Sequence, residues 1–139
     1  MICDIYEGTT QLQTVAAIRY VTNGFYAQVI EEYEQLPVAA ELEGTKARIK
    51  AMAEKFNACT AAVKEAADQD LHDLCARHLY EMAADVIMCH LLMQNATKAP
   101  ELFAGSLQVY VNLAEAELEK HHKWLQGMNV AQLDNYRKA

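Results

Sequence analysis

Residues 71–95 have the sequence LHDLCARHLYEMAADVIMCHLLMQN, and this segment organises the predicted fold of the whole chain. An α-helix places residues three and four apart on one face. Apolar side chains recur in the segment at alternating steps of four and three residues, at Cys75, Leu79, Met82, Val86, Cys89 and Met93. The spacing predicts one long helix with a buried stripe. Beside that stripe lie Leu71, Leu74, Ala83 and His90.

Three further segments repeat this spacing and predict three more amphipathic helices. The first, about residues 10–35, has its stripe at Leu12, Val15, Ile18, Thr22, Phe25, Val29, Tyr33 and Leu36. The second, about residues 44–67, has its stripe at Ile49, Met52, Phe56, Cys59, Val63 and Ala66. The last, about residues 100–126, has its stripe at Leu107, Tyr110, Ala114, Leu118, His121 and Leu125.

Helix boundaries follow from residues that stop or cap helices. Pro37 ends the first helix, because the residue before a proline avoids helical angles. Residues 68–70 predict a turn and a cap, and residues 96–100 predict the next connection, with Pro100 in a first helical turn. Gly127 is a predicted stop. Asn23 and Gly24 are predicted to lie inside the first helix as a tolerated weak point.

Four amphipathic helices joined by short loops bury their stripes most simply as an antiparallel, up-down four-helix bundle. We therefore predict an all-α fold with a long first helix. The 139 residues, 53% apolar with only 2 prolines, suit a single bundle of this kind. The apolar stripe of the first helix, where exposed, also predicts that the protein pairs with itself as a homo-oligomer.

Charge and cysteine usage restrict the function classes. The net charge of −7 argues against a nucleic-acid or anionic-membrane partner, because phosphates attract Lys and Arg. No run of about 18 apolar residues predicts a membrane span, and Asp4 and Glu7 interrupt any N-terminal signal peptide. The four cysteines, with no C-x-x-C pair, predict reduced thiols and a cytoplasmic location. They are Cys3, Cys59, Cys75 and Cys89.

Residues 5–13, IYEGTTQLQ, carry the clearest chemical signal. Thr9 or Thr10 can cap the helix that follows, and Gly8 lets the backbone approach a ligand closely. Free N–H groups at a helix start suit a carbonyl or a phosphate. A carboxylate beside them, that of Glu7, could remove a proton next to a carbonyl while the N–H groups hold the developing oxyanion.

This nonapeptide closely resembles the signature I-Y-E-G-T-S-x-I-Q near the C-terminus of acyl-CoA dehydrogenases, with Thr10 and Leu12 as mild departures. The resemblance implies that Glu7 is the catalytic base that removes the α-proton of a fatty acyl-CoA. It implies that Gly8 contacts the substrate. It places Thr9, Thr10 and Gln11 next to the flavin, FAD.

In that family the β-hydride leaves for the flavin, and electrons then pass to electron-transfer flavoprotein. The flavin-binding body precedes the signature, so the resemblance implies that this chain is a C-terminal fragment, inactive alone. Residues 1–35 would end the catalytic domain. Residues 36–139 would be an appended helical domain that packs with the first helix as one bundle. The acyl chain length is not set by these residues.

The sequence is compatible with two functions other than that of a dehydrogenase. A free-standing helical interaction or assembly module would leave Glu7 without a flavin to serve. A di-metal bundle would need two Glu-x-x-His pairs, but only Glu119 and His122 form one, and His78 and Glu81 have the reverse order. No metal site is therefore predicted.

His72 and His90 are predicted to be hydrogen-bonded residues at the edge of the third helix's stripe, and His121 and His122 to be structural or solvated near the end of the fourth helix. Glu31, Glu32 and Glu34 are predicted to form a solvated face. Packing at the ends of the bundle is predicted for three aromatic residues, Tyr110, Trp124 and Tyr136.

Overall fold

The structure, a computed structural model, describes the backbone of residues 23–138 and the side chains of residues 23–135. Its helices are α2 (Phe25–Glu34), α3 (Glu43–Ala66), α4 (Gln69–Lys98), α5 (Pro100–Gly127) and α6 (Val130–Lys138), with a short 3-10 turn at Ala40–Leu42. These residues contain no strand, so the predicted all-α class is confirmed.

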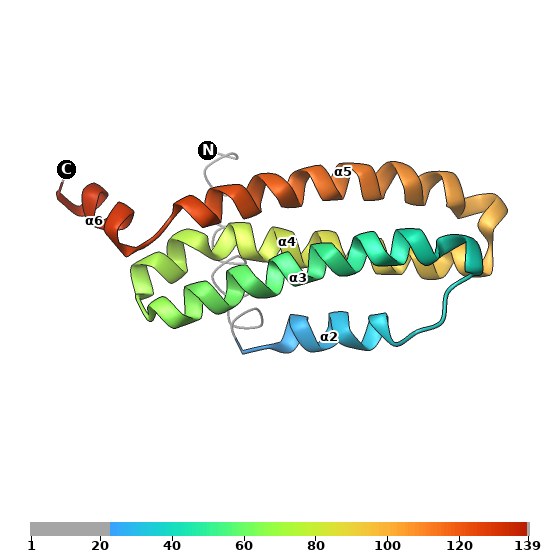
Figure 1. Ribbon diagram of the computed structural model, residues 1–139, viewed down its shortest axis with the longest axis horizontal. Helices are drawn as coiled ribbons and strands as arrows, with labels where there is room; N and C mark the ends of the chain where they lie inside the picture. The colour runs from blue at the N-terminus through green and yellow to red at the C-terminus, as the bar shows by residue number, and fades with distance from the viewer. Residues whose placement is uncertain (1–22, 139) are drawn as a thin grey trace, which may run out of the picture.

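The helices alternate in direction along the bundle, as an up-down topology requires (Figure 1). Helix α4 runs antiparallel to α3 and to α5, and α2 lies against α4 and α3. Helix α6 extends past the end of the bundle at which α3 gives way to α4 (Figure 1). The predicted antiparallel helical bundle is confirmed. No helix within residues 23–138 has the length and apolar character of a membrane span.

The stripe of α4 forms the centre of the core. All six of its predicted members are buried, and Leu71 and Ala96 extend the buried face towards both ends of the helix. Helix α3 packs Ile49, Met52 and Phe56 against it, and α5 packs Leu107, Val111, Ala114 and Leu118. On α5 the structure buries Val111, whereas Tyr110 of the predicted stripe is only partly buried, and Ala66 of α3 is exposed.

The connection between α3 and α4 confirms the predicted cap. The Asp68 Oδ1 atom accepts hydrogen bonds from the backbone N–H groups of Asp70 and Leu71, at 3.0 and 3.1 Å. Ala67 before it has φ 51°, in the left-handed region. Such a residue lets the chain leave α3 and enter α4 within two residues.

The predicted connection over residues 96–100 is too long. Helix α4 continues to Lys98 and leaves Ala99 alone before α5 begins at Pro100. Ala96 is fully buried, and the Thr97 hydroxyl donates to the Met93 carbonyl oxygen at 2.9 Å, so core packing and a local hydrogen bond extend the helix. Pro100 lies in the first turn of α5, and Gly127 is its last residue, as predicted.

The prediction that Asn23 and Gly24 lie inside one continuous helix is wrong. Gly24 has φ 87°, which an α-helix does not allow and which glycine adopts most readily. The Phe25 N–H donates to the Asn23 side-chain oxygen at 2.9 Å, and α2 begins there. Its buried residue is Ile30, whereas Phe25 is 50% exposed. The earlier part of the predicted first helix lies outside the described residues.

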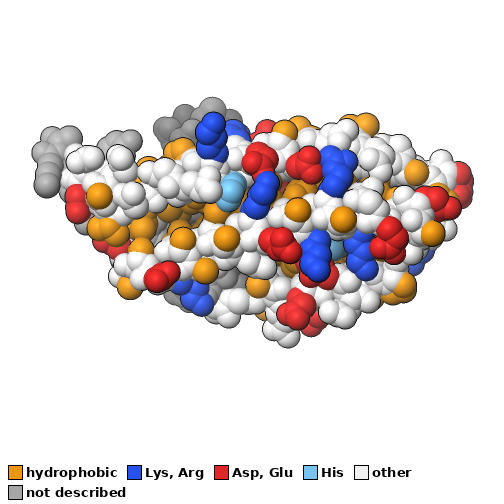
Figure 2. All heavy atoms as spheres, viewed as in Figure 1, with side chains coloured by type: hydrophobic (Ala, Val, Ile, Leu, Met, Phe, Trp, Pro, Cys, Tyr) orange, Lys and Arg blue, Asp and Glu red, His pale blue; other side chains and the backbone are white. Residues whose placement is uncertain are grey.

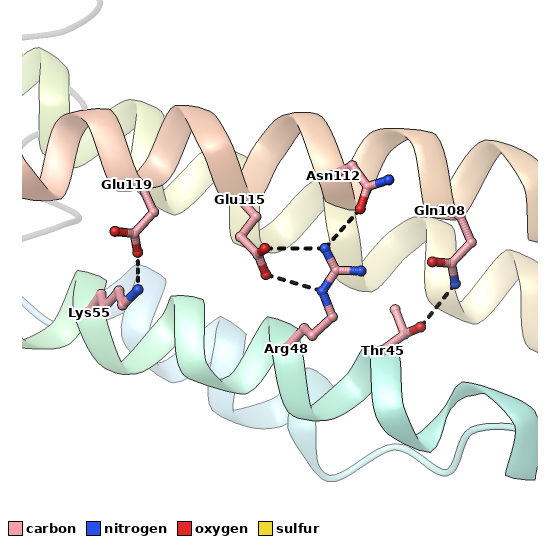
Figure 3. Close-up of polar contacts among 7 residues, drawn as sticks. All are labelled: Thr45, Arg48, Lys55, Gln108, Asn112, Glu115 and Glu119. Carbon is pink, nitrogen blue, oxygen red and sulfur yellow. Dashed lines mark hydrogen bonds and ion pairs between the residues drawn. The ribbon is translucent and has the colours of Figure 1, made fainter.

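Polar contacts fix the register of α3 on α5 (Figure 3). The Arg48 guanidinium donates to both carboxylate oxygens of Glu115, at 3.1 and 3.2 Å, and to the Asn112 amide oxygen at 2.9 Å. One turn towards the start of α3, Thr45 accepts a hydrogen bond from the Gln108 side chain at 3.0 Å. Lys55 and Glu119 form an ion pair further along. Exposed pairs stabilise little individually, but together they exclude a shifted helix alignment.

Two leucines on different faces of α4 test which face contributes most to the stability of the fold. Leu79 is 0% exposed, whereas Leu74 is 40% exposed. We expect Leu79→Ala to lower the free energy of unfolding by about 2–5 kcal/mol, because a cavity remains in a packed core. Leu74→Ala should cost less than about 1 kcal/mol, because it leaves no enclosed cavity. Urea unfolding followed by circular dichroism measures both, and equal losses would contradict this account of the core.

Candidate functional site

The residues to which the sequence assigns chemistry are Glu7, Gly8, Thr9, Thr10 and Gln11, and all of them lie outside the described residues. Their roles therefore stay predictions. Within residues 23–138, the fold brings polar side chains together between α3 and α5, as described above, and also between α4 and α5.

A pair of histidines joins α4 to α5. The Nδ1 atoms of His78 and His121 lie 2.7 Å apart, so one ring donates a hydrogen bond and the other accepts it. The His78 ring also stacks on Trp124, with ring centroids 3.9 Å apart. Both Nδ1 atoms cannot carry a proton at this distance, because two N–H groups would then point at each other.

Glu81 approaches the pair from the other side of His121. Its Oε2 atom lies 2.9 Å from the His121 Nε2 atom, although the two are not aligned as a hydrogen bond. Burial lowers the pKa of both histidines, and for His121 the Glu81 charge opposes that effect. The histidine pair can hold one proton between the two Nδ1 atoms. His121 is buried, and Glu81 also pairs with Arg77, which favours a structural role in the α4–α5 contact.

The sequence did not predict that His78 meets His121. His78 lies 21 residues before Ala99 and His121 lies 22 residues after it. Equal distances from a one-residue hairpin connection place two residues side by side. The sequence spacing could therefore have predicted this pair, but only with the one-residue connection at Ala99. The sequence pattern predicts a connection of five residues.

The two carboxylate–histidine pairs considered as metal ligands, Glu119 with His122 and His78 with Glu81, do not come together in the structure. Glu119 pairs with Lys55 of α3, and His122 lies at an apolar groove instead of beside His78 and Glu81. In the part of the chain that the structure describes, no group of three or more His, Cys, Asp or Glu side chains is arranged to hold a metal ion.

Asp85 lies half-buried one turn beyond Glu81 on α4. Burial, together with the negative charges of Glu117 and Glu81, raises the pKa of its carboxyl to about 6. The charged form is therefore disfavoured in the folded state relative to the unfolded chain.

His90 occupies the interface between α4 and α2. It is fully buried and stacks on Tyr33, with ring centroids 5.7 Å apart and 13° between the ring planes. Neither ring nitrogen has a hydrogen-bond partner among the described residues, and burial lowers the pKa to about 4, with a smaller contribution from Lys46. The prediction that His90 is a hydrogen-bonded edge residue is wrong. His72 is half-buried, with its Nδ1 atom 3.6 Å from the Asp73 carboxylate.

An apolar groove of about 700 Å³ lies where α3, α4, α5 and α6 meet. Alanines 58, 62 and 66 of α3 line one side, and Leu125, Met128 and Val130 line the other. Hydrophobic atoms gather at this end of the molecule in Figure 2. Polar groups at the groove come from His122, Gln126 and Asn129. They include no carboxylate, so His122 is the only evident candidate for a general base among the described residues that line the groove.

The starts of the three longest helices, α3, α4 and α5, fit a flavin poorly. A flavin diphosphate needs free backbone N–H groups without nearby negative charge. Glu43, Asp70 and Glu101 lie in the first turns of α3, α4 and α5, and Asp68 already occupies the N–H groups at the start of α4. The starts of these three helices are therefore unfavourable sites for the phosphates of FAD.

The raised pKa of Asp85 gives a stability prediction with a definite sign. Above pH 6 the ionised carboxylate costs stability, and the cost disappears as the pH falls, because the folded state takes up the proton before the unfolded chain does. We expect Asp85→Asn to raise the free energy of unfolding at pH 8 by about 1–2 kcal/mol, a value discounted for partial exposure. Near pH 4 the gain should vanish.

Urea unfolding at both pH values measures this difference. Glu65→Gln removes one negative charge at an exposed position of α3 and serves as the control. A gain for Asp85→Asn that is the same at pH 8 and pH 4 would show that ionisation of Asp85 is not its cause.

The pKa of His90 predicts the opposite dependence of stability on pH. Its folded pKa is lowered, so its contribution is complete above about pH 6.5 and is lost as the unfolded chain takes up protons at lower pH. His90→Phe keeps a flat ring against Tyr33 and cannot titrate. We expect the stability of the variant relative to the wild type to improve by about 2–3 kcal/mol between pH 7 and pH 4.5. Parallel pH profiles of the two proteins would contradict the burial of a neutral His90.

Comparison with known proteins identifies the helical region. Residues 22–133 match the family described as acyl-CoA dehydrogenase C terminal. Among solved structures, the acyl-CoA dehydrogenase family protein from Porphyromonas gingivalis is 38% identical, with a TM-score of 0.76. The match covers 82% of this chain and 98% of that one. No curated protein matches the chain. The chain therefore belongs to the acyl-CoA dehydrogenase family, through the family's C-terminal helical domain.

Proposed function

We propose that this chain is the C-terminal part of a flavin-dependent acyl-CoA dehydrogenase, an oxidoreductase that introduces a double bond between the α and β carbons of a fatty acyl-CoA. One observation carries the proposal. The region that matches the family's C-terminal domain begins at residue 22, shortly after the signature-like segment at residues 5–13. Two independent marks of one family thus follow each other in a single chain.

In this proposal Glu7 is the base that accepts the α-proton. A carboxylate can accept that proton if it lies within hydrogen-bond reach of the α-carbon. Gly8 allows the backbone to approach the acyl-CoA, and Thr9, Thr10 and Gln11 contact the cofactor. FAD, when bound, supplies the acceptor for the β-hydride. Electron-transfer flavoprotein would then receive the electrons in a cytoplasmic pathway of fatty acid oxidation.

The helical region has a different task in the intact protein. Its acidic helix starts disfavour the phosphates of FAD, and its histidine pair lies between two packed helices. We therefore assign residues 1–35 to the end of the catalytic domain and residues 36–139 to an appended domain for packing or assembly. The chain by itself is expected to be inactive, because in the resembling family the flavin-binding body and most of the acyl-CoA pocket precede the signature.

A second candidate is a helical assembly module that acts without catalysis. The observation that favours it is the coverage of the Porphyromonas gingivalis structure. The matched helical region accounts for 98% of that chain, so the solved chain consists almost wholly of a helical domain of this kind. In that case residues 5–13 would have no catalytic task.

Glu7→Gln in the intact enzyme tests the catalytic proposal. The amide keeps the shape of the side chain and loses its basicity, so we expect turnover of acyl-CoA to fall by about 10³-fold or more. The flavin absorbance spectrum of the purified protein should stay unchanged, because the cofactor contacts are not altered. Steady-state kinetics with an artificial electron acceptor measures the loss.

Glu32→Gln, the same chemical change at an exposed position of α2, is the control and should leave turnover intact. Normal turnover by Glu7→Gln would place the base elsewhere. If the protein that contains this chain in the cell binds no flavin, the assembly module is the better account.

A further inference from the structure

Helix α5 carries a second apolar stripe on the side opposite its core face. Its members, which we call the outer α5 stripe, are Leu102, Ser106, Val109, Leu113 and Ala116. They follow the same alternation of four and three residues as the buried stripes. Leu102, Val109 and Leu113 are 70%, 71% and 57% exposed, and Ser106 and Ala116 are exposed as well.

Single exposed apolar residues are common and need no explanation, but this alignment is unusual. The stripe spans about 21 Å of helix at 1.5 Å per residue and contains no charged residue, in a chain in which 22% of residues are charged. Figure 2 shows that the face between α3 and α5, by contrast, is lined with acidic and basic side chains. Stripes with this spacing are typical of helices that pack against another helix.

The order of large and small residues indicates which helix fits. Leu102 lies seven residues before Val109, and Ala116 lies seven residues after it. Ser106 lies three residues before Val109, and Leu113 lies four after it. If two copies of α5 lie antiparallel with Val109 facing itself, each leucine of one copy faces a small residue of the other. A parallel pair would instead set Leu102 on Leu102 and leave a gap at the serines.

Charges near the stripe agree with the antiparallel order. Glu101 lies in the first turn of α5, and Lys120 and Lys123 lie towards its end. Lysine side chains on a helix lean towards its N-terminus, so in an antiparallel pair both lysines come within reach of the partner copy's first turn. Glu101 and Lys123 have no ion pair among the described residues, while Lys120 pairs with Glu117 of its own helix at 3.0 Å.

We propose that two copies of this chain pair through the outer α5 stripe, antiparallel, about a two-fold axis at Val109. Such an isologous contact closes after two copies. The inference specifies the assembly role proposed for the helical domain and does not depend on the chemistry proposed for Glu7. A contact between one helix and one helix belongs to the small class of interfaces, so the pair should dissociate on dilution.

Disulfide trapping of the 139-residue chain tests the pairing. In a Cys3→Ser background, Val109→Cys should form an intermolecular disulfide, because the two-fold axis places residue 109 beside its own copy. Leu102→Cys alone should not, because the two sites would lie about 21 Å apart, beyond disulfide reach. A mixture of Leu102→Cys and Ala116→Cys should couple. Lys64→Cys, exposed on α3, sets the rate of random collision.

We expect Val109→Cys to couple about tenfold faster than Lys64→Cys, because a formed pair holds the two thiols at a high effective concentration. Leu113→Lys added to Val109→Cys should reduce coupling to the Lys64→Cys rate while the helical circular dichroism stays unchanged. Coupling of Val109→Cys at the control rate would overturn the proposal and leave the stripe to another partner, such as the catalytic body. Coupling of Leu102→Cys alone at the rate of Val109→Cys would overturn the antiparallel order. Neither result involves the flavin or Glu7, so both are separable from a failure of the catalytic proposal.

Discussion

Packing of the α4 stripe between α3 and α5 is the interaction on which the rest of the structure depends. The six residues of the stripe have almost no exposed surface, and they contact apolar faces of both neighbouring helices. Burial of this kind is the dominant favourable term in folding. Turns, caps and polar contacts then select one alignment of helices that are already held together. Examples are the cap at Asp68, the connection at Ala99 and the Arg48–Glu115 ion pair.

Enclosing α4 in this way also buries groups that water would otherwise solvate. His90 is covered by α2, Asp85 is half-buried near α5, and His78 and His121 are forced to share one proton. Each of these groups is perturbed in its pKa, yet none lines the apolar groove at the end of the bundle. Perturbed pKa values mark functional sites only when a ligand can reach the groups. Here they are a consequence of dense helix packing.

The chain thus separates two tasks along its length. Chemistry is proposed for residues 5–13, where a carboxylate precedes a glycine and two threonines, and the helical region provides a rigid body that follows it. Helix α2, which begins at Phe25, is the described helix nearest in sequence to residues 5–13, and it is held by Ile30 and by the stacking of Tyr33 on His90. Helix α5, which carries the outer α5 stripe, lies on the opposite side of the bundle from α2 (Figure 1).

The sequence by itself determined the helix class, the members of the α4 stripe, the cap at Asp68, and the start and end of α5 at Pro100 and Gly127. These features depend on spacing and on local hydrogen bonding, which neighbouring residues fully specify. Only the tertiary structure decided that His78 meets His121, that His90 is buried without a hydrogen-bond partner among the described residues, and that α4 continues to Lys98. Those outcomes depend on which helix covers which face and on how short the connection at Ala99 is. A residue 43 positions away in the sequence becomes a neighbour only after two helices have been aligned.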